Sequence, residues 1–289
     1  MGARTVAEAL AAARGLGLDP LDAQLLLAHQ LGRDRAWLLA HDGDPLAADV
    51  LARFDAEAKR RADGVPLAYL TGRREFHGLE LQVDPAVLDP RPDTETLVDW
   101  ALELLPSTGV ERPAVVDLGT GSGAVALAIA HRCPGAHVTA TDLSAAALET
   151  ARANARRLGL AVSFASGSWW SAVPGSRFAL AVSNPPYIAA DDPHLPALRH
   201  EPLMALTPGG DGLDAIRAIV AGAPGHLLAG AWLLLEHGWD QADAVQALLR
   251  EAGFRDLQSR RDLAGHARCS GGLWLPEPNG RRLATTDEK

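Results

Sequence analysis

Short apolar segments alternate with helical patterns from Ala114 onward, and this alternation limits the fold more than any other feature of the chain. Strands that alternate with helices are typical of a parallel sheet with helices on both faces. Two last strands, near the carboxyl end, are separated by too few residues for a helix, so we expect an antiparallel pair at one edge. The prediction is a doubly wound α/β fold with a mostly parallel, seven-stranded sheet. The expected strands are Ala114–Asp117, His137–Thr141, Val162–Ala165, Phe178–Ser183, Ala231–Glu236, Phe254–Arg260 and Ala267–Leu275, and the helices among them are Ala124–Cys133, Ser144–Leu158, Leu213–Ala221 and Gln241–Ala252.

The amino-terminal part of the chain predicts a small all-α unit. Helix starts are indicated by a capping box of Thr5 and Glu8, by Asp19-Pro20, by Asp34, and by Asp44-Pro45, whose helix is expected to end at Asp63. A helical unit without catalytic residues, fused to a larger domain, often recognises a partner. We therefore expect residues 1–63 to form a substrate-recognition domain.

The pattern changes after residue 63. The segment Glu75–Val83 alternates around Gly78 as a β-hairpin would, and the prolines of Asp89–Pro92 then interrupt it. A helix is expected from Asp93 or Thr94 to Leu105. These patterns predict a hairpin linker over 64–92, an α/β domain over 93–280 and a flexible tail over 281–289.

Composition excludes several classes of protein. The chain has 289 residues, and 47% of them are hydrophobic, which is ample for a core. Its net charge of −9 argues against a protein whose main function is to bind nucleic acid. Cys133 and Cys269 lack metal-ligand spacing, so no metal site is expected. The sequence begins without a signal peptide or membrane-spanning segment, so we expect a cytoplasmic protein that does not bind a membrane. A monomer is a separate expectation.

A glycine-rich loop follows the first strand of the predicted sheet. At this position the backbone must approach a nucleotide-like ligand closely, so the loop is a candidate cofactor site. Asp142, at the end of the next strand, could accept hydrogen bonds from the two hydroxyls of a ribose, or could instead cap the following helix beside Ser144. The loop also fits the dinucleotide pattern G-x-G-x-x-[GA], so NAD and S-adenosylmethionine remain alternatives. The loop residues are Gly119, Thr120, Gly121, Ser122 and Gly123.

The segment Asn184-Pro185-Pro186-Tyr187 gathers rare residue types at the end of an apolar strand. The chain has only three Asn and two Tyr. The carboxamide of Asn184 and the carbonyl groups next to proline form a rigid set of hydrogen-bonding groups, which suits a planar NH2 group. Tyr187 could stack against that group. A plain turn at the end of a core strand would also explain the segment. Together with Trp169, either an adenine contact or a core residue, this favours a methyl donor over a hydride donor.

These residues resemble those of a known family. The chain resembles the protein-(glutamine-N5) methyltransferases that modify peptide chain release factors, the PrmC/HemK family, in segments whose order and spacing agree over nearly its whole length. The segments are Pro66 to Gly72, Glu75 to Leu79, Pro90 to Glu95, Asp117 to Gly123, Gly167 to Trp170, Val182 to Ile188, His200 to Pro202 and Gly210 to Leu213. Ser168 departs from the family, where Asp is common.

The resemblance implies a methyltransferase of translation termination, with the class I S-adenosylmethionine-dependent fold after an all-α domain and a hairpin linker. It implies that Gly119 to Gly123, Asp142 and Trp169 hold S-adenosylmethionine, and that Asn184 contacts both cofactor and substrate. It further implies that Asn184 to Tyr187 receive the glutamine of a Gly-Gly-Gln loop, and that the helical domain docks the release factor. Asn184, Pro185 and Tyr187 are the expected catalytic residues.

The sequence is also compatible with other targets and with other classes of protein. The same chemistry could act on a glutamine of a ribosomal protein, or on an adenine N6 amine in nucleic acid, against which the acidic net charge counts. An NAD-binding oxidoreductase and a catalytically silent Rossmann module are the alternatives from other classes.

Overall fold

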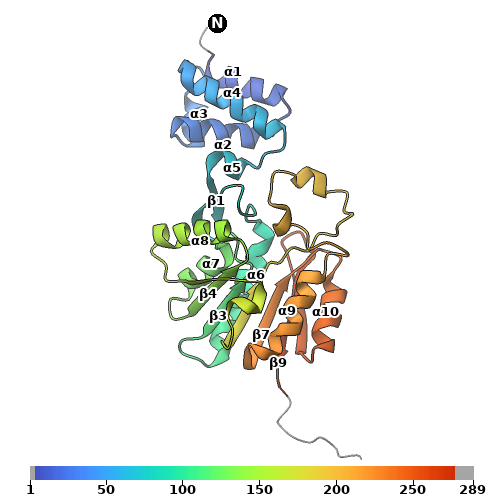
Figure 1. Ribbon diagram of the computed structural model, residues 1–289. Coiled ribbons are helices and arrows are strands. Elements are labelled where there is room, and N and C mark those ends of the chain that lie inside the picture. Colours follow the sequence, from blue (N-terminus) through green and yellow to red (C-terminus); the bar gives the residue numbers. More distant parts are fainter. Residues whose placement is uncertain (1–3, 277–289) are drawn as a thin grey trace, which may run out of the picture.

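A seven-stranded sheet forms the centre of the larger of two units in the computed structural model, which describes residues 4–276 (Figure 1). The strand order is β5-β4-β3-β6-β7-β9-β8, in which β3 to β7 run parallel and β9 pairs antiparallel with both β7 and β8. The predicted sheet, including its antiparallel edge pair, is confirmed. The strands are β3 (Ala114–Leu118), β4 (His137–Asp142), β5 (Ser163–Ser166), β6 (Phe178–Ser183), β7 (Leu227–Glu236), β8 (Arg255–Arg261) and β9 (Ala267–Trp274).

Helices cover both faces of this sheet, as the apolar strands require. Alternate residues of β7 show the two cores: Trp232 and Leu234 pack with the helices of one face, and Leu233 and Leu235 with those of the other. A strand buried on both faces reads as a continuous apolar run, which is why these strands could be found in the sequence. One face carries α6 (Glu95–Leu104), α7 (Ala124–Arg132) and α8 (Ala145–Leu158), and the other α9 (Asp214–Gly222) and α10 (Ala242–Glu251).

The helical unit has a core of its own, built around Leu26, Leu27 and Phe54. Thr5, Asp19 and Asp34 cap the first three helices as predicted. The predicted start of the fourth helix at Asp44-Pro45 is wrong. Residues 44–46 run extended beside the start of α1, since Asp44 O accepts from Val6 N at 3.0 Å and Leu46 N donates to Arg4 O at 2.9 Å. The helices are α1 (Val6–Gly15), α2 (Pro20–Leu31), α3 (Arg35–Ala40) and α4 (Ala48–Ala62).

A short helix and a hairpin join the two units (Figure 1). The helix α5 (Leu67–Thr71) was not predicted, and its Leu70 belongs to the core of the helical unit. The hairpin pairs β1 (Arg73–Phe76) with β2 (Leu79–Gln82), as expected, through a turn at His77 and Gly78 with φ of 50° and 81°. The tail expected over 281–289 lies outside the described residues.

A buried asparagine attaches this hairpin to the large unit. Asn154, in α8, is fully buried, and its Oδ1 accepts from Gln82 N at 2.7 Å. Its Nδ2 donates to Gln82 O at 2.9 Å and to Ser122 O at 3.0 Å. One side chain therefore connects β2, α8 and the glycine-rich loop.

We predict that Asn154→Ala lowers the free energy of unfolding by about 3 kcal/mol, because it removes three hydrogen bonds, two part-buried ones to the Gln82 backbone and a buried one to Ser122 O. Urea denaturation measures this loss. Glu149→Ala, at an exposed position of the same helix, is the control and should change stability by less than about 0.5 kcal/mol. Equal stability of the two variants would contradict the role of Asn154.

Candidate active site

A cavity of about 190 Å³ opens at the carboxyl ends of β3, β4 and β6. This is the edge at which open α/β sheets bind ligands. Three predicted site residues, Gly123, Pro185 and Tyr187, are absent from its lining. The predicted residues that line it are Gly119, Thr120, Gly121, Ser122, Asp142, Trp169, Asn184 and Pro186.

The glycine-rich loop adopts a conformation that needs glycine. Gly119, Gly121 and Gly123 have φ of 74°, 56° and 86°, in the left-handed region that favours glycine. A Cβ on Gly123 would lie 3.0 Å from Leu127 Cδ1 and 3.2 Å from Ala151 Cβ, so this glycine allows α7 and α8 to pack closely. The loop thus presents its backbone, with few side chains, to the cavity.

The buried carboxyl group of Asp117 stabilises the loop. Asp117, at 1% exposure, accepts from Thr120 Oγ1 at 2.6 Å and from Ala126 N at 3.2 Å, and it also lines the cavity. Burial raises the pKa of Asp117 to about 7, although these two hydrogen bonds lower it. Asp117 was not among the predicted site residues. The sequence feature that could have identified Asp117 is an acidic residue at the end of an apolar strand, directly before the loop.

Asp142 contacts both the glycine-rich loop and the residue before α8, while the N-cap of α8 is Ser144 itself, whose Oγ accepts from Ala147 N at 3.2 Å. Asp142 Oδ2 accepts from Gly121 N at 2.9 Å, and Asp142 Oδ1 accepts from Ser144 N at 2.8 Å. Each carboxylate oxygen can accept a second hydrogen bond. The half-buried carboxylate therefore fixes the loop and still offers acceptors to a ligand in the cavity.

The adjacent tryptophans face different surroundings. Trp170 is buried and donates from Nε1 to Ile219 O at 2.7 Å, as a core residue would. Trp169 has a positive φ of 48° and lines the cavity beside the loop, where a Cβ on Gly119 would lie 3.2 Å from its Cζ3. Glycine at 119 thus allows the indole to pack against the loop.

The Asn184–Tyr187 segment follows β6 directly. Asn184 Nδ2 donates to Thr94 Oγ1 at 3.1 Å, and Pro185 is buried. The Tyr187 hydroxyl donates to Glu236 Oε1 at 3.3 Å. Burial and the charge of Glu236 raise the pKa of Tyr187. The structure thus brings Asn184 and Pro186 to the cavity and directs the Tyr187 hydroxyl to Glu236.

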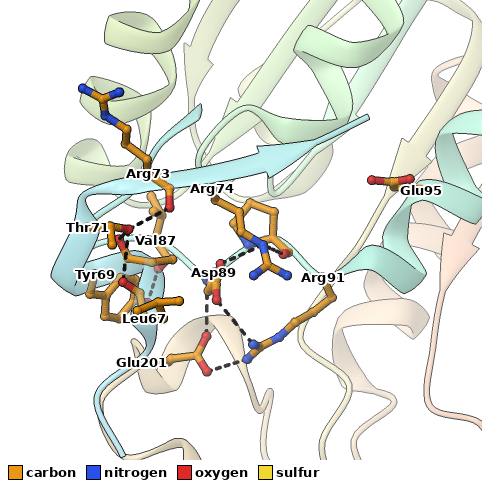
Figure 2. A network of polar contacts seen from close by, with 12 residues as sticks. Leu67, Tyr69, Thr71, Arg73, Arg74, Val87, Asp89, Arg91, Glu95 and Glu201 are labelled. Atoms are coloured by element: carbon orange, nitrogen blue, oxygen red, sulfur yellow. Dashed lines mark hydrogen bonds and ion pairs between the residues drawn. The ribbon is translucent and has the colours of Figure 1, made fainter. Parts of the chain in front are cut away.

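A polar network fixes the segment that closes the cavity on another side (Figure 2). Glu201 is buried, pairs with Arg91, and accepts from Asp89 N at 3.2 Å. Asp89 Oδ1 forms an ion pair with Arg74, a residue of the hairpin, whose Nε lies 3.3 Å away. Pro202 and Met204, just after Glu201, line the cavity. The linker thus holds the segment 201–205 over the cavity.

Arg199 and His200, directly before this segment, contact the helical unit. Arg199 Nη2 pairs with Asp63 Oδ1 at 2.9 Å, and His200 Nε2 lies 3.1 Å from Asp63 O.

The helices of residues 4–276 include none with the length and hydrophobicity that a membrane span requires. In the same residues, no group of three or more His, Cys, Asp or Glu side chains is arranged to hold a metal ion.

Comparisons with known proteins match both units. Residues 3–72 match the PrmC N-terminal domain, and residues 94–211 match the methyltransferase small domain. A release factor glutamine methyltransferase of Bordetella pertussis is 55% identical over 89% of this chain and 95% of its own length. One of Xylella fastidiosa (strain Temecula1) is 52% identical over 91% of this chain and 96% of its own.

Among solved structures, the 16S rRNA methyltransferase RsmC of T. thermophilus, in complex with AdoMet and guanosine, has a TM-score of 0.53 at 21% identity. The match covers 70% of this chain and 49% of that one. At this identity the likeness concerns the fold alone.

We predict that the pKa of Asp117 makes stability depend on pH. Because the folded state binds this proton more tightly than the unfolded state, the free energy of unfolding falls as pH rises from the ordinary carboxyl pKa of 3.8 to about 7. Between about pH 5 and 7, the free energy of unfolding of the wild type should therefore fall by roughly 1 kcal/mol per pH unit more than that of Asp117→Asn. Urea titrations at several pH values test this, and parallel stability curves would contradict it.

Proposed function

The chain belongs to the family of release factor glutamine methyltransferases, and we propose that it methylates the side-chain amide nitrogen (N5) of the glutamine in the Gly-Gly-Gln loop of peptide chain release factors, with S-adenosylmethionine as donor. One observation carries the proposal. A single cavity is lined by the glycine-rich loop, by Asp142 and by Asn184, so the proposed donor site and the proposed site for an NH2 group would be continuous.

The residues of the loop fit S-adenosylmethionine. Gly119 to Gly123 would receive the amino-acid part of the donor against the backbone, Asp142 would accept from the ribose hydroxyls, and Trp169 would pack near the adenine. The open lone pairs of Asp142 and the position of Trp169 beside Gly119 support this assignment. When bound, S-adenosylmethionine supplies a methyl group on a positively charged sulfur.

The Asn184–Tyr187 segment would hold the acceptor amide. An amide nitrogen is a poor nucleophile because its lone pair is delocalised into the carbonyl. We propose that Asn184 Oδ1 and the Pro185 carbonyl oxygen accept its two N–H groups, so that the nitrogen can become pyramidal toward the methyl. Tyr187 would pack beside the amide plane. Positioning then supplies much of the acceleration, and no dedicated base is needed if the proton leaves after transfer.

The helical unit is proposed to dock the release factor. Its contact with the segment 199–205, through Asp63, supports a link between docking and the cavity.

We also propose a cytoplasmic monomer, and gel filtration with light scattering tests the oligomeric state. A ribosomal-protein glutamine is the second candidate target, since the cavity chemistry would be the same. An adenine amine is disfavoured by the net charge of −9.

The test is methyl transfer to defined targets. The protein is incubated with labelled S-adenosylmethionine and each release factor, with a Gln→Ala loop variant as the control, and the modified residue is located by mass spectrometry. The proposal expects label only on the loop glutamine. Label on a ribosomal protein or nucleic acid instead, or tight NAD(H) binding without affinity for S-adenosylmethionine, would overturn it.

We predict that Asn184→Ala lowers kcat at least a hundredfold while the Kd of S-adenosylmethionine stays within about threefold, because the lost oxygen acts mainly on the acceptor amide. Single-turnover methylation and calorimetry measure the two quantities. Full activity in this variant would rule out the proposed mechanism.

We predict that Asp142→Ala acts first on the cofactor. Loss of a charged acceptor for the ribose should raise the Kd of S-adenosylmethionine at least tenfold. Asp243→Ala, at an exposed position in the first turn of α10, is the control and should bind as wild type does. Unchanged affinity in Asp142→Ala would refute this assignment.

A further inference from the structure

The Asn184–Tyr187 segment lies beyond the sheet that precedes it. Within the described residues, the pairing of β6 with β7 ends at Ser183, and neither Pro185 nor Pro186 has a backbone N–H with which to extend it. The proposed chemistry nevertheless needs the Pro185 carbonyl oxygen and the Tyr187 ring at fixed positions, because a small displacement of a positioning group lowers the rate strongly. Other parts of the chain must therefore hold this segment.

The side chain of Gln241 holds the carboxyl end of the segment. Gln241 stands at the N-cap position of α10 and is half-buried. Its Nε2 donates to Tyr187 O at 3.0 Å, and its Oε1 accepts from Gly238 N at 2.8 Å. A backbone N–H only donates and a backbone carbonyl only accepts, so these two contacts fix the orientation of the carboxamide. Gln241 N also donates to Gly238 O at 3.0 Å, which closes the turn between β7 and α10.

The turn that carries Gln241 is itself attached to the sheet. His237 is fully buried and donates from its backbone N to Arg268 O at 3.0 Å. Its Nε2 lies 2.8 Å from Ser270 Oγ. Both partners belong to β9. Gln241 therefore connects Tyr187 to a turn whose position is set by the sheet.

The side chain of Tyr187 contacts the same part of the chain. Its hydroxyl donates to Glu236 Oε1 at 3.3 Å, and Glu236 is the last residue of β7. The consecutive residues 236–241 thus hold Tyr187 both at its hydroxyl and at its carbonyl group. Two contacts from one short segment determine where the ring lies.

The loop 209–212 approaches the same carbonyl group. A Cβ on Gly212 would overlap with Tyr187 O and would lie 3.0 Å from Ala189 N, and Gly212 has a φ of 82°. Both observations require glycine at this position. Packing against this loop and the hydrogen bond from Gln241 together fix the Tyr187 carbonyl.

We propose that Gln241 is a positioning residue for methyl transfer, which holds the Tyr187 carbonyl and thereby fixes the Pro185 carbonyl and the Tyr187 ring around the acceptor amide. Gln241 is not among the residues that line the cavity, so it acts through Tyr187 and not on the substrate itself. This inference rests on the proposed function, since it requires that the Asn184–Tyr187 segment receives the glutamine.

The main test removes both side-chain hydrogen bonds and keeps the length of the side chain. Gln241→Met should lower kcat for release factor methylation roughly tenfold, because the acceptor amide is held less accurately. The Kd of S-adenosylmethionine should stay within about twofold of the wild-type value, since the glycine-rich loop and Asp142 are unchanged. Single-turnover methylation and calorimetry measure the two quantities.

Gln241→Glu separates the contact with Tyr187 from the contact within the turn. A carboxylate can still accept from Gly238 N but cannot donate to Tyr187 O. A negative charge at the start of a helix is also favourable. This variant should therefore melt no lower than Gln241→Met and still lose kcat to at least the same extent. A role confined to the turn would instead leave the kcat of Gln241→Glu at the wild-type value.

Gln246→Met is the matched control. Gln246 lies in the same helix, is also half-buried, and donates from Nε2 to Ser259 Oγ at 2.9 Å. Ser259 belongs to the edge strand β8, so the substitution removes a comparable hydrogen bond that does not involve the Asn184–Tyr187 segment. The kcat of this control should remain within about twofold of wild type.

The outcomes separate this inference from the function on which it rests. A wild type that transfers no methyl to any release factor would overturn the proposed function. With an active wild type, a wild-type kcat in Gln241→Met or in Gln241→Glu would overturn the positioning role alone. A loss of kcat in Gln246→Met equal to that in Gln241→Met would also overturn it, because the effect would then belong to α10 in general.

Discussion

The parallel pairing of β3 with β6 is the contact on which the rest of the structure depends. From β3 the chain winds outward to β4 and β5 and then returns to β6, so the strand order reverses between these two neighbours. The register aligns Asp117 with Val182, and the glycine-rich loop and Asn184 therefore leave the sheet at the same edge. Such a reversal opens a crevice at the carboxyl ends of the strands. The proposed donor and acceptor sites are adjacent because of this sheet topology.

Buried polar side chains then fix the loops that the sheet brings together. Asp117 holds the start of α7, Asn154 holds Ser122 and the hairpin, and Glu201 holds the segment over the cavity. Each would be costly without its partners, so each specifies one arrangement of the loop that it contacts. The linker takes part in both the Asn154 and the Glu201 contacts, and its residues 86–88 and 90 line the cavity, so the linker is a structural part of the cavity as well as a connection between units.

Much of this could be predicted from the sequence, because strands buried on both faces and glycine-dependent turns leave local patterns. The positions of Asp142 and Asn184 followed from the ends of such strands. Thr94 and Glu236 could not be found in this way, because Thr94 meets Asn184 across 90 residues and Glu236 ends an apolar run. The different surroundings of Trp169 and Trp170 depend on a positive φ at Trp169, which favours glycine and is rarely indicated by sequence. The helix α5 was missed because it is only five residues long.

The most direct test of the account is a crystal structure of the protein with S-adenosylhomocysteine and a Gly-Gly-Gln peptide. We expect the ribose hydroxyls to donate to Asp142, and the glutamine NH2 to lie between Asn184 Oδ1 and the Pro185 carbonyl oxygen, with Asn184 Nδ2 still donating to Thr94 Oγ1. A glutamine side chain bound away from Asn184, or a carboxamide turned with its nitrogen toward the peptide, would contradict it.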